Sequence, residues 1–200
     1  MSARLGSLQS RYSETSVTTA REVSVKRTFG SLTAQEALHV AIFIEERNAE
    51  IYRQFAEMFA EFRDPESLEI AAAFWDLFNE ERRHGSMLQE RYMDRHGTSP
   101  CAITEDDIKE LIEVPRLENG EIFSVNKVKS GRSPRQMAFA VAIAAEESAA
   151  QFYRNLAEAT QDPQMRAFYQ EFADLESTHS TLLENRAQEA SSNLGSGHSA

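Results

Sequence analysis

The sequence predicts an all-α protein: a four-helix bundle with a long crossover between its second and third helices. Three observations indicate this fold. Four long segments carry apolar residues at helical spacing, each begins with a helix start signal, and the second and third are separated by a stretch too long for a tight turn. Amphipathic helices of this length bury their apolar faces against one another, which is the arrangement of a bundle.

The first two helices are expected over 33–62 and 65–96. The first begins with a capping box, in which Thr33 and Glu36 satisfy backbone N–H groups of the first turn. The second begins at Asp64-Pro65, an N-cap followed by proline. Their predicted core faces hold Leu38, Ala41, Ile42, Ala49, Tyr52, Phe55 and Phe59 in the first helix, and Ile70, Phe74, Leu77, Phe78, Leu88 and Tyr92 in the second.

The last two helices are expected over 134–160 and 163–188. A capping box of Ser133 and Gln136 begins the third, and Asp162 before a proline begins the fourth. The large aromatic side chains expected in the core of the bundle include Phe74, Trp75, Phe78, Tyr169 and Phe172.

The connection over 97–133 separates the two helix pairs and contains a short possible helix over 104–113. Its length lets the third helix start at the far end of the bundle and run parallel to the second. The ends of the chain lack apolar periodicity. We therefore predict a flexible N-terminal tail over 1–30, a bundle over 31–188 and a flexible C-terminal tail over 189–200.

The composition narrows the classes of function. The chain has 200 residues, of which 41% are hydrophobic, and one cysteine, Cys101, which excludes a disulfide framework, a four-thiolate metal centre and an iron–sulfur cluster. A formal net charge of −11 disfavours nucleic acid and anionic membranes as partners. Because the sequence shows no membrane span and no secretory signal, a cytoplasmic location is expected.

The two halves of the sequence repeat each other. Placing Val40 on Val141 aligns VAIFIEERNAEIYRQFAE with VAIAAEESAAQFYRNLAE and matches Glu, Tyr and Arg positions as well as apolar ones. Further along, Glu81 and His84 align with Glu176 and His179. The repeat predicts two helical hairpins related by an approximate two-fold axis, each contributing half of one shared centre.

That centre contains two Glu-x-x-His motifs, Glu81 with His84 and Glu176 with His179. A carboxylate and an imidazole at this spacing project from one face of a helix and reach one cation. Glu45 and Glu146 occupy matching mid-helix positions flanked by apolar residues, so their side chains are expected to point inward. A shift of the helical phase by one residue would put Glu46 or Glu147 there instead.

Four buried carboxylates and two neutral imidazoles require neutralisation, which two divalent cations supply. This is the ligand set of di-iron and di-manganese carboxylate bundles. Glu81 and Glu176 are the candidate bridging ligands, Glu45 and Glu146 the terminal carboxylates, and His84 and His179 the nitrogen ligands. Oxygen and nitrogen donors suit iron, manganese and zinc alike.

These helices and motifs, with Tyr52 and Tyr153 each seven residues after Glu45 and Glu146, resemble the ferritin-like superfamily and most closely its rubrerythrin-like branch, over roughly 33–188. The resemblance implies two iron ions that react with hydrogen peroxide or dioxygen. It also implies tyrosines that hydrogen-bond to metal-bound carboxylates. Two helical turns separate each tyrosine from its glutamate, so each is expected beside the metal of its own glutamate.

Three residues depart from the family patterns. With Cys101 alone, the chain has no ligands for a rubredoxin iron, so the electron donor is expected to be external. Ala149 stands where typical rubrerythrins have an additional glutamate, which weakens the case for specialised peroxidase behaviour. Arg82 replaces the methionine that binds haem in bacterioferritins, so no haem is implied.

The leading hypothesis is therefore a rubrerythrin-like di-iron oxidoreductase of peroxidase or ferroxidase type, in which a homodimer is possible. One alternative keeps the centre but assigns hydroxylation of an organic substrate. Another is an iron-binding or iron-storage subunit of a larger assembly. Loading with ferrous iron and reaction with peroxide distinguish the three.

Overall fold

The computed structural model describes residues 29–112 and 133–196. Within them the fold is all-helical, with four long helices and no strand, which confirms the predicted fold class. None of these helices is long and apolar enough to cross a membrane. The elements are the 3-10 helix η1 (Phe29–Ser31) and the α-helices α1 (Ala34–Phe62), α2 (Pro65–His96), α3 (Glu105–Leu111), α5 (Pro134–Ala159) and α6 (Pro163–Ser196).

The predicted start signals all act as caps. Capping boxes begin α1 at Thr33 and α5 at Ser133, and the Asp64 side chain accepts from the backbone N–H of Ser67 at the start of α2. At the start of α6, Asp162 Oδ1 accepts from the backbone N–H of Gln164 at 2.9 Å. These local hydrogen bonds explain why the helix starts could be predicted within a residue.

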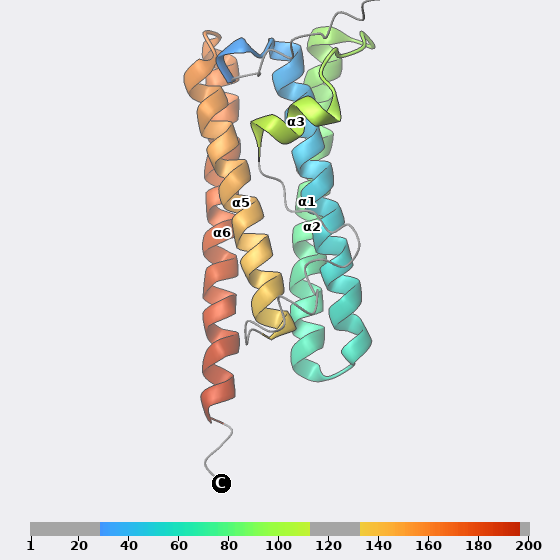
Figure 1. Ribbon diagram of the computed structural model, residues 1–200, viewed down its shortest axis with the longest axis vertical. Helices are drawn as coiled ribbons and strands as arrows, with labels where there is room; N and C mark the ends of the chain where they lie inside the picture. Colours follow the sequence, from blue (N-terminus) through green and yellow to red (C-terminus); the bar gives the residue numbers. More distant parts are fainter. Residues whose placement is uncertain (1–28, 113–132, 197–200) are drawn as a thin grey trace, which may run out of the picture.

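Two antiparallel hairpins make up the bundle, α1 with α2 and α5 with α6 (Figure 1). In Figure 1, α1 descends and α2 ascends; α5 then begins at the lower end and ascends, so that it runs parallel to α2 as predicted. The short helix α3 lies across the bundle, with Ile108 in the core. The predicted crossover lies partly outside the described residues.

Two apolar clusters fill the core on either side of the middle of the bundle. We call the first the upper apolar cluster; it includes Leu38, Phe152, Tyr153, Tyr169 and Phe172. The second, the lower apolar cluster, includes Tyr52, Phe55, Phe59, Phe74 and Phe139. Along each long helix the two clusters lie on opposite sides of the glutamates predicted as ligands. The predicted centre therefore lies between two water-excluding layers.

One aromatic residue predicted for the core is outside it. Trp75 is 36% exposed and packs edge-on against the half-buried Phe78, with ring centroids 5.4 Å apart. Phe74 already occupies the inward direction on this turn, and successive helical residues are rotated by about 100°. Trp75 therefore points toward the surface.

The fourth long helix also runs further than predicted. It ends at Ser196 rather than near 188, because Gln188, Glu189 and Ala190 favour helix and the first strong helix breaker is Gly195. The predicted C-terminal tail thus begins within α6. Most of the predicted N-terminal tail, and the last four residues of the predicted C-terminal tail, lie outside the described residues.

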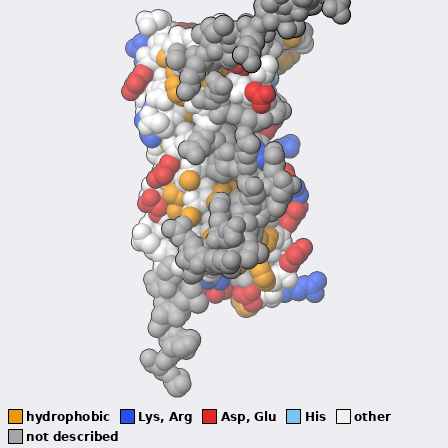
Figure 2. Space-filling model, viewed as in Figure 1, with side chains coloured by type: hydrophobic (Ala, Val, Ile, Leu, Met, Phe, Trp, Pro, Cys, Tyr) orange, Lys and Arg blue, Asp and Glu red, His pale blue; other side chains and the backbone are white. Residues whose placement is uncertain are grey.

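The described surface in Figure 2 carries acidic and basic side chains interspersed along its margins, with hydrophobic side chains between them. No patch of a single sign dominates the described part of this face.

Candidate metal centre

All six residues predicted as ligands meet in the middle of the bundle. Each long helix contributes: Glu45 from α1, Glu81 and His84 from α2, Glu146 from α5, and Glu176 and His179 from α6. The four carboxylates are fully buried, and the two histidines are 8% and 7% exposed. The alternative helical phase is wrong, since Glu46 and Glu147 are exposed.

The six side chains form two overlapping groups whose ligand atoms lie within 4.8 Å of one another. The His84 group consists of Glu45, Glu81, His84 and Glu176; the His179 group consists of Glu81, Glu146, Glu176 and His179. Glu81 and Glu176 belong to both groups, which is the arrangement that two carboxylates bridging two cations require. The geometry is that of a candidate dinuclear metal site.

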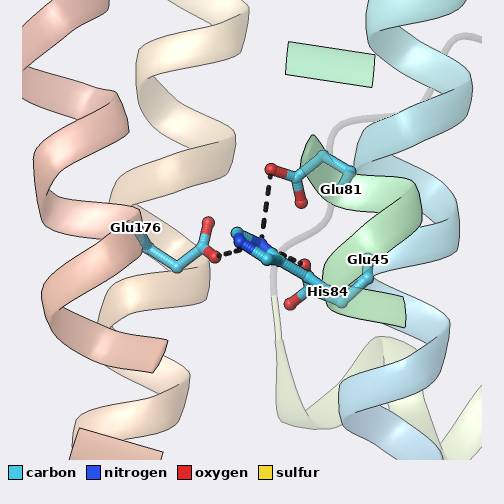
Figure 3. Close-up of side chains that lie close together, drawn as sticks. All are labelled: Glu45, Glu81, His84 and Glu176. Carbon is cyan, nitrogen blue, oxygen red and sulfur yellow. Dashed lines mark ion pairs between the residues drawn. The ribbon is translucent and has the colours of Figure 1, made fainter. Parts of the chain in front are cut away.

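In the His84 group the imidazole lies between three carboxylates (Figure 3). The Nδ1 atom of His84 is 3.3 Å from Glu45 Oε2 and 3.4 Å from Glu176 Oε1. It is 3.9 Å from Glu81 Oε1. The Glu176 side chain reaches this group from α6, on the opposite hairpin.

The His179 group repeats this arrangement. Its imidazole Nδ1 is 3.4 Å from Glu81 Oε1 and 3.6 Å from Glu146 Oε2. The two imidazole rings lie nearly parallel, with an angle of 10° between their planes and 5.5 Å between their centroids. Both histidines thus direct the same nitrogen into the shared space.

The donor atoms that face this space have no hydrogen-bond partner in the described residues. Buried polar atoms normally have one, because leaving them unpaired costs about 1–3 kcal/mol each. Carboxylate oxygens and imidazole nitrogens are also the atoms that divalent cations bind. The six residues therefore fit a pair of metal ions. The unpaired atoms are Glu45 Oε2, both Glu81 oxygens, His84 Nδ1, Glu146 Oε2, both Glu176 oxygens and His179 Nδ1.

The electrostatics lead to the same conclusion. Burial and the neighbouring carboxylates Glu146 and Glu45 raise the pKa of Glu81 well above its ordinary value. Burial and the negative charges of Glu81 and Glu45 raise the pKa of Glu176 in the same way. Two divalent cations would balance four ionised carboxylates and remove this penalty.

The two tyrosines bond to carboxylates of the opposite hairpin, which corrects the sequence-based expectation. Tyr52 donates to Glu146 Oε1, and Tyr153 donates to Glu45 Oε1. Side chains lean toward the N-terminus of their helix, so each tyrosine hydroxyl points back toward the centre and reaches a carboxylate of the facing helix. Burial and the adjacent carboxylate raise the pKa of both tyrosines, so both hydroxyls keep their protons at neutral pH.

Sequence reasoning missed two residues beside the centre. Glu80 Oε2 lies 2.8 Å from His179 Nε2, the outer ring nitrogen; the other ring nitrogen, Nδ1, faces the ligand carboxylates Glu81 and Glu146. Comparison of the two Glu-x-x-His segments would have singled this residue out, because Leu175 stands at the equivalent place. Asn48, one turn after Glu45, is buried, and its side-chain nitrogen has no hydrogen-bond partner in the part of the chain that the structure describes; the other half has Ala149 at this place.

Residues 138–198 match the Rubrerythrin family model. This part of the chain is rubrerythrin-like. It comprises most of α5 and all of α6, and so includes Glu146, Glu176 and His179. The resemblance predicted from the sequence is confirmed over these residues. No curated protein and no solved structure matches the chain.

Proposed function

We propose that this protein is a non-haem di-iron oxidoreductase of rubrerythrin-like type that reacts with hydrogen peroxide or dioxygen. The observation that carries the proposal is the pair of buried groups sharing Glu81 and Glu176, whose inward-facing donor atoms have no hydrogen-bond partner among the described residues. The rubrerythrin-like match over 138–198 favours iron over manganese or zinc. When bound, iron would supply the electrons that reduce the oxidant.

In this proposal the six side chains would hold two ions. Glu81 and Glu176, which belong to both groups, would be the bridging carboxylates, Glu45 and Glu146 the terminal ones, and His84 and His179 the nitrogen ligands. With four helices contributing, the spacing of the ligands is set by the packing of the bundle rather than by any one loop.

The surrounding residues keep the centre dry and oriented. Tyr52 and Tyr153 each donate to one oxygen of a terminal carboxylate and leave the other oxygen facing the centre. The upper and lower apolar clusters exclude bulk water along the bundle axis, which strengthens electrostatic interactions within the site. The proposed reaction further requires an external electron donor, and a homodimer remains part of the proposal.

Anaerobic titration with Fe²⁺ tests the proposal. We expect saturation at two ions per chain, followed by a change in the near-ultraviolet absorption on addition of peroxide without any other substrate. The control variant Glu46→Ala should still bind two ions, because Glu46 neighbours a proposed ligand but is exposed. A full-length protein that binds no Fe²⁺ would overturn the proposal.

Other outcomes would point to other functions. Uptake of many iron ions per chain by a large assembly would favour a storage role. Two bound ions that stay inert to both oxidants until an organic molecule is added would favour a hydroxylase.

A further inference from the structure

The two imidazoles of the centre are held differently on their outer sides. The outer Nε2 atom of His179 is 2.8 Å from Glu80 Oε2. In the described residues no carboxylate lies within ion-pair distance of the outer Nε2 atom of His84. The His84 ring instead packs edge-on against Phe172, with ring centroids 5.5 Å apart.

The contact with Glu80 selects one form of the His179 ring. A neutral imidazole carries its proton on one nitrogen and a lone pair on the other. A carboxylate beside Nε2 holds a proton there, so Nδ1, beside Glu81 and Glu146, is the nitrogen left to bind a cation. His179 therefore has its metal-binding nitrogen oriented before a cation arrives.

The internal repeat explains why His84 lacks this support. Glu80 directly precedes Glu81 on α2, and the residue that directly precedes Glu176 on α6 is Leu175. The leucine side chain has no atom that accepts a hydrogen bond. Within the described residues, the pseudo-two-fold arrangement thus keeps the six ligands but provides the outer carboxylate for His179 and not for His84.

We propose that Glu80 is a positioning residue that makes the His179 group the tighter of the two metal positions, so that this position fills first. The inference rests on the proposed dinuclear centre and adds an order to its loading. Carboxylates that hold the outer nitrogen of a metal-binding histidine contribute about 10–100-fold in metal affinity in other proteins, which is the size of effect expected here.

Glu80 can be replaced without removing part of the core. Its side chain is 38% exposed, and its other oxygen, Oε1, lies 3.4 Å from the exposed Arg83. It also lines a surface cavity of about 250 Å³ together with Leu182 and Arg186 of α6. A substitution at this position therefore tests the contact with His179 rather than the fold.

Anaerobic titration of the full-length protein with Co²⁺, followed by its visible absorption, measures the two binding steps separately. We expect two unequal steps in the parent protein. Glu80→Leu, which copies the residue of the other half, should weaken the first step about 10–100-fold and bring the two steps together. Glu80→Gln should lie between, because its amide oxygen still accepts a hydrogen bond from Nε2. Glu90→Leu, at an exposed position of the same helix, is the control and should change neither step.

The reverse exchange, Leu175→Glu, should strengthen the second step by supplying His84 with an acceptor. A loss confined to one step is not the result of a loosened bundle, which would weaken both. Two bound ions with equal affinities, or an unchanged first step in Glu80→Leu, would overturn the inference while the dinuclear centre stands. A parent protein that binds no Co²⁺ and no Fe²⁺ would overturn the proposed function and this inference together.

Discussion

The α1·α2 hairpin and the rubrerythrin-like α5·α6 hairpin supply the same three ligand types but surround them with different residues. Each contributes two glutamates and one histidine to the middle of the bundle. Beside them, Glu80 stands opposite Leu175 in the repeat, and Asn48 opposite Ala149. The ligand residues match because each hairpin supplies donor atoms to the same two groups. The residues beside the ligands can differ between the hairpins, because such a difference removes no donor atom.

A second pair of equivalent residues differs in the same way. Arg53 pairs with Glu50 and Glu57 on its own helix, at 2.7 and 2.5 Å. Its counterpart Arg154 instead donates to the Ser177 hydroxyl on α6, at 3.1 Å. One arginine thus stabilises a single helix and the other joins two, so a conserved residue type does not guarantee a conserved contact.

The largest expected effect tests what the two halves share. Glu81→Ala and Glu176→Ala each remove a carboxylate that belongs to both groups. Either substitution should therefore abolish tight binding of both ions, whereas Glu146→Ala should affect the His179 group alone. Isothermal titration calorimetry with Co²⁺ measures how many ions each variant binds and how tightly.

Glu147→Ala is the matched control for these variants, because Glu147 is exposed next to Glu146. Loss of only one ion from Glu81→Ala would contradict the assignment of Glu81 as a bridging ligand.

In the metal-free protein, the free energy of unfolding should depend on pH through Glu81 and Glu176, the two carboxylates that belong to both groups. Without metal, the raised pKa values of Glu81 and Glu176 mean that the folded protein binds more protons than the unfolded chain. This contribution to stability is fully present below the ordinary pKa of 4.5 and is lost as pH rises through the raised values. Metal ions replace these protons, so the increase in Tm on loading should grow with pH.

The measurement is the Tm of chelator-treated and of Co²⁺-loaded protein, compared at a series of pH values from 4.5 upward. An increase in Tm on loading that shrinks as pH rises would be inconsistent with protonated bridging carboxylates in the metal-free state.

A smaller effect tests the crossing of the tyrosines. Tyr52→Phe removes the donor to Glu146, and Tyr153→Phe removes the donor to Glu45. Each should cost about 1.5–3 kcal/mol in the free energy of unfolding, the range for hydrogen bonds to charged groups. Tyr52→Phe should weaken Co²⁺ binding at the His179 group, and Tyr153→Phe at the His84 group.

Tyr169→Phe is the control, because in the described residues its hydroxyl bonds to none of the six ligands. If each tyrosine variant instead weakened the position that contains the glutamate of its own helix, the crossed arrangement would be wrong.

The smallest effect concerns the two arginines. The ion pair with Arg53 and a hydrogen bond from Gln54 lower the pKa of Glu50 from 4.5 to about 2. Arg53→Ala should therefore reduce the free energy of unfolding only slightly, because exposed ion pairs are screened by solvent. That cost is present above pH 4.5 and disappears as pH falls through about 2. Arg154→Ala removes a hydrogen bond to a neutral hydroxyl, so the loss should not follow this pH dependence. Urea unfolding at several pH values distinguishes the two variants.

Local features could be predicted because their causes lie within a few residues. The capping pairs at Thr33 and Ser133 act within one helical turn, and the inward direction of Glu45 follows from the apolar residues around it. The end of α6 could not be placed as well, since its last turns contain no strong stop signal before Gly195. The prediction that Trp75 lies in the core was wrong because an aromatic residue near the edge of the apolar face of a helix can pack either in the core or at the surface.

The sequence by itself determined the helices, their pairing into two related hairpins and the six side chains that converge between them. Periodicity, caps and the internal repeat are properties of the chain, and they suffice for these features. Only the tertiary structure decided that each tyrosine bonds across to the other hairpin and that Glu80 contacts His179. Those contacts depend on how far α1 lies from α5 and α2 from α6, and such distances are set by the packing of side chains from all four helices together.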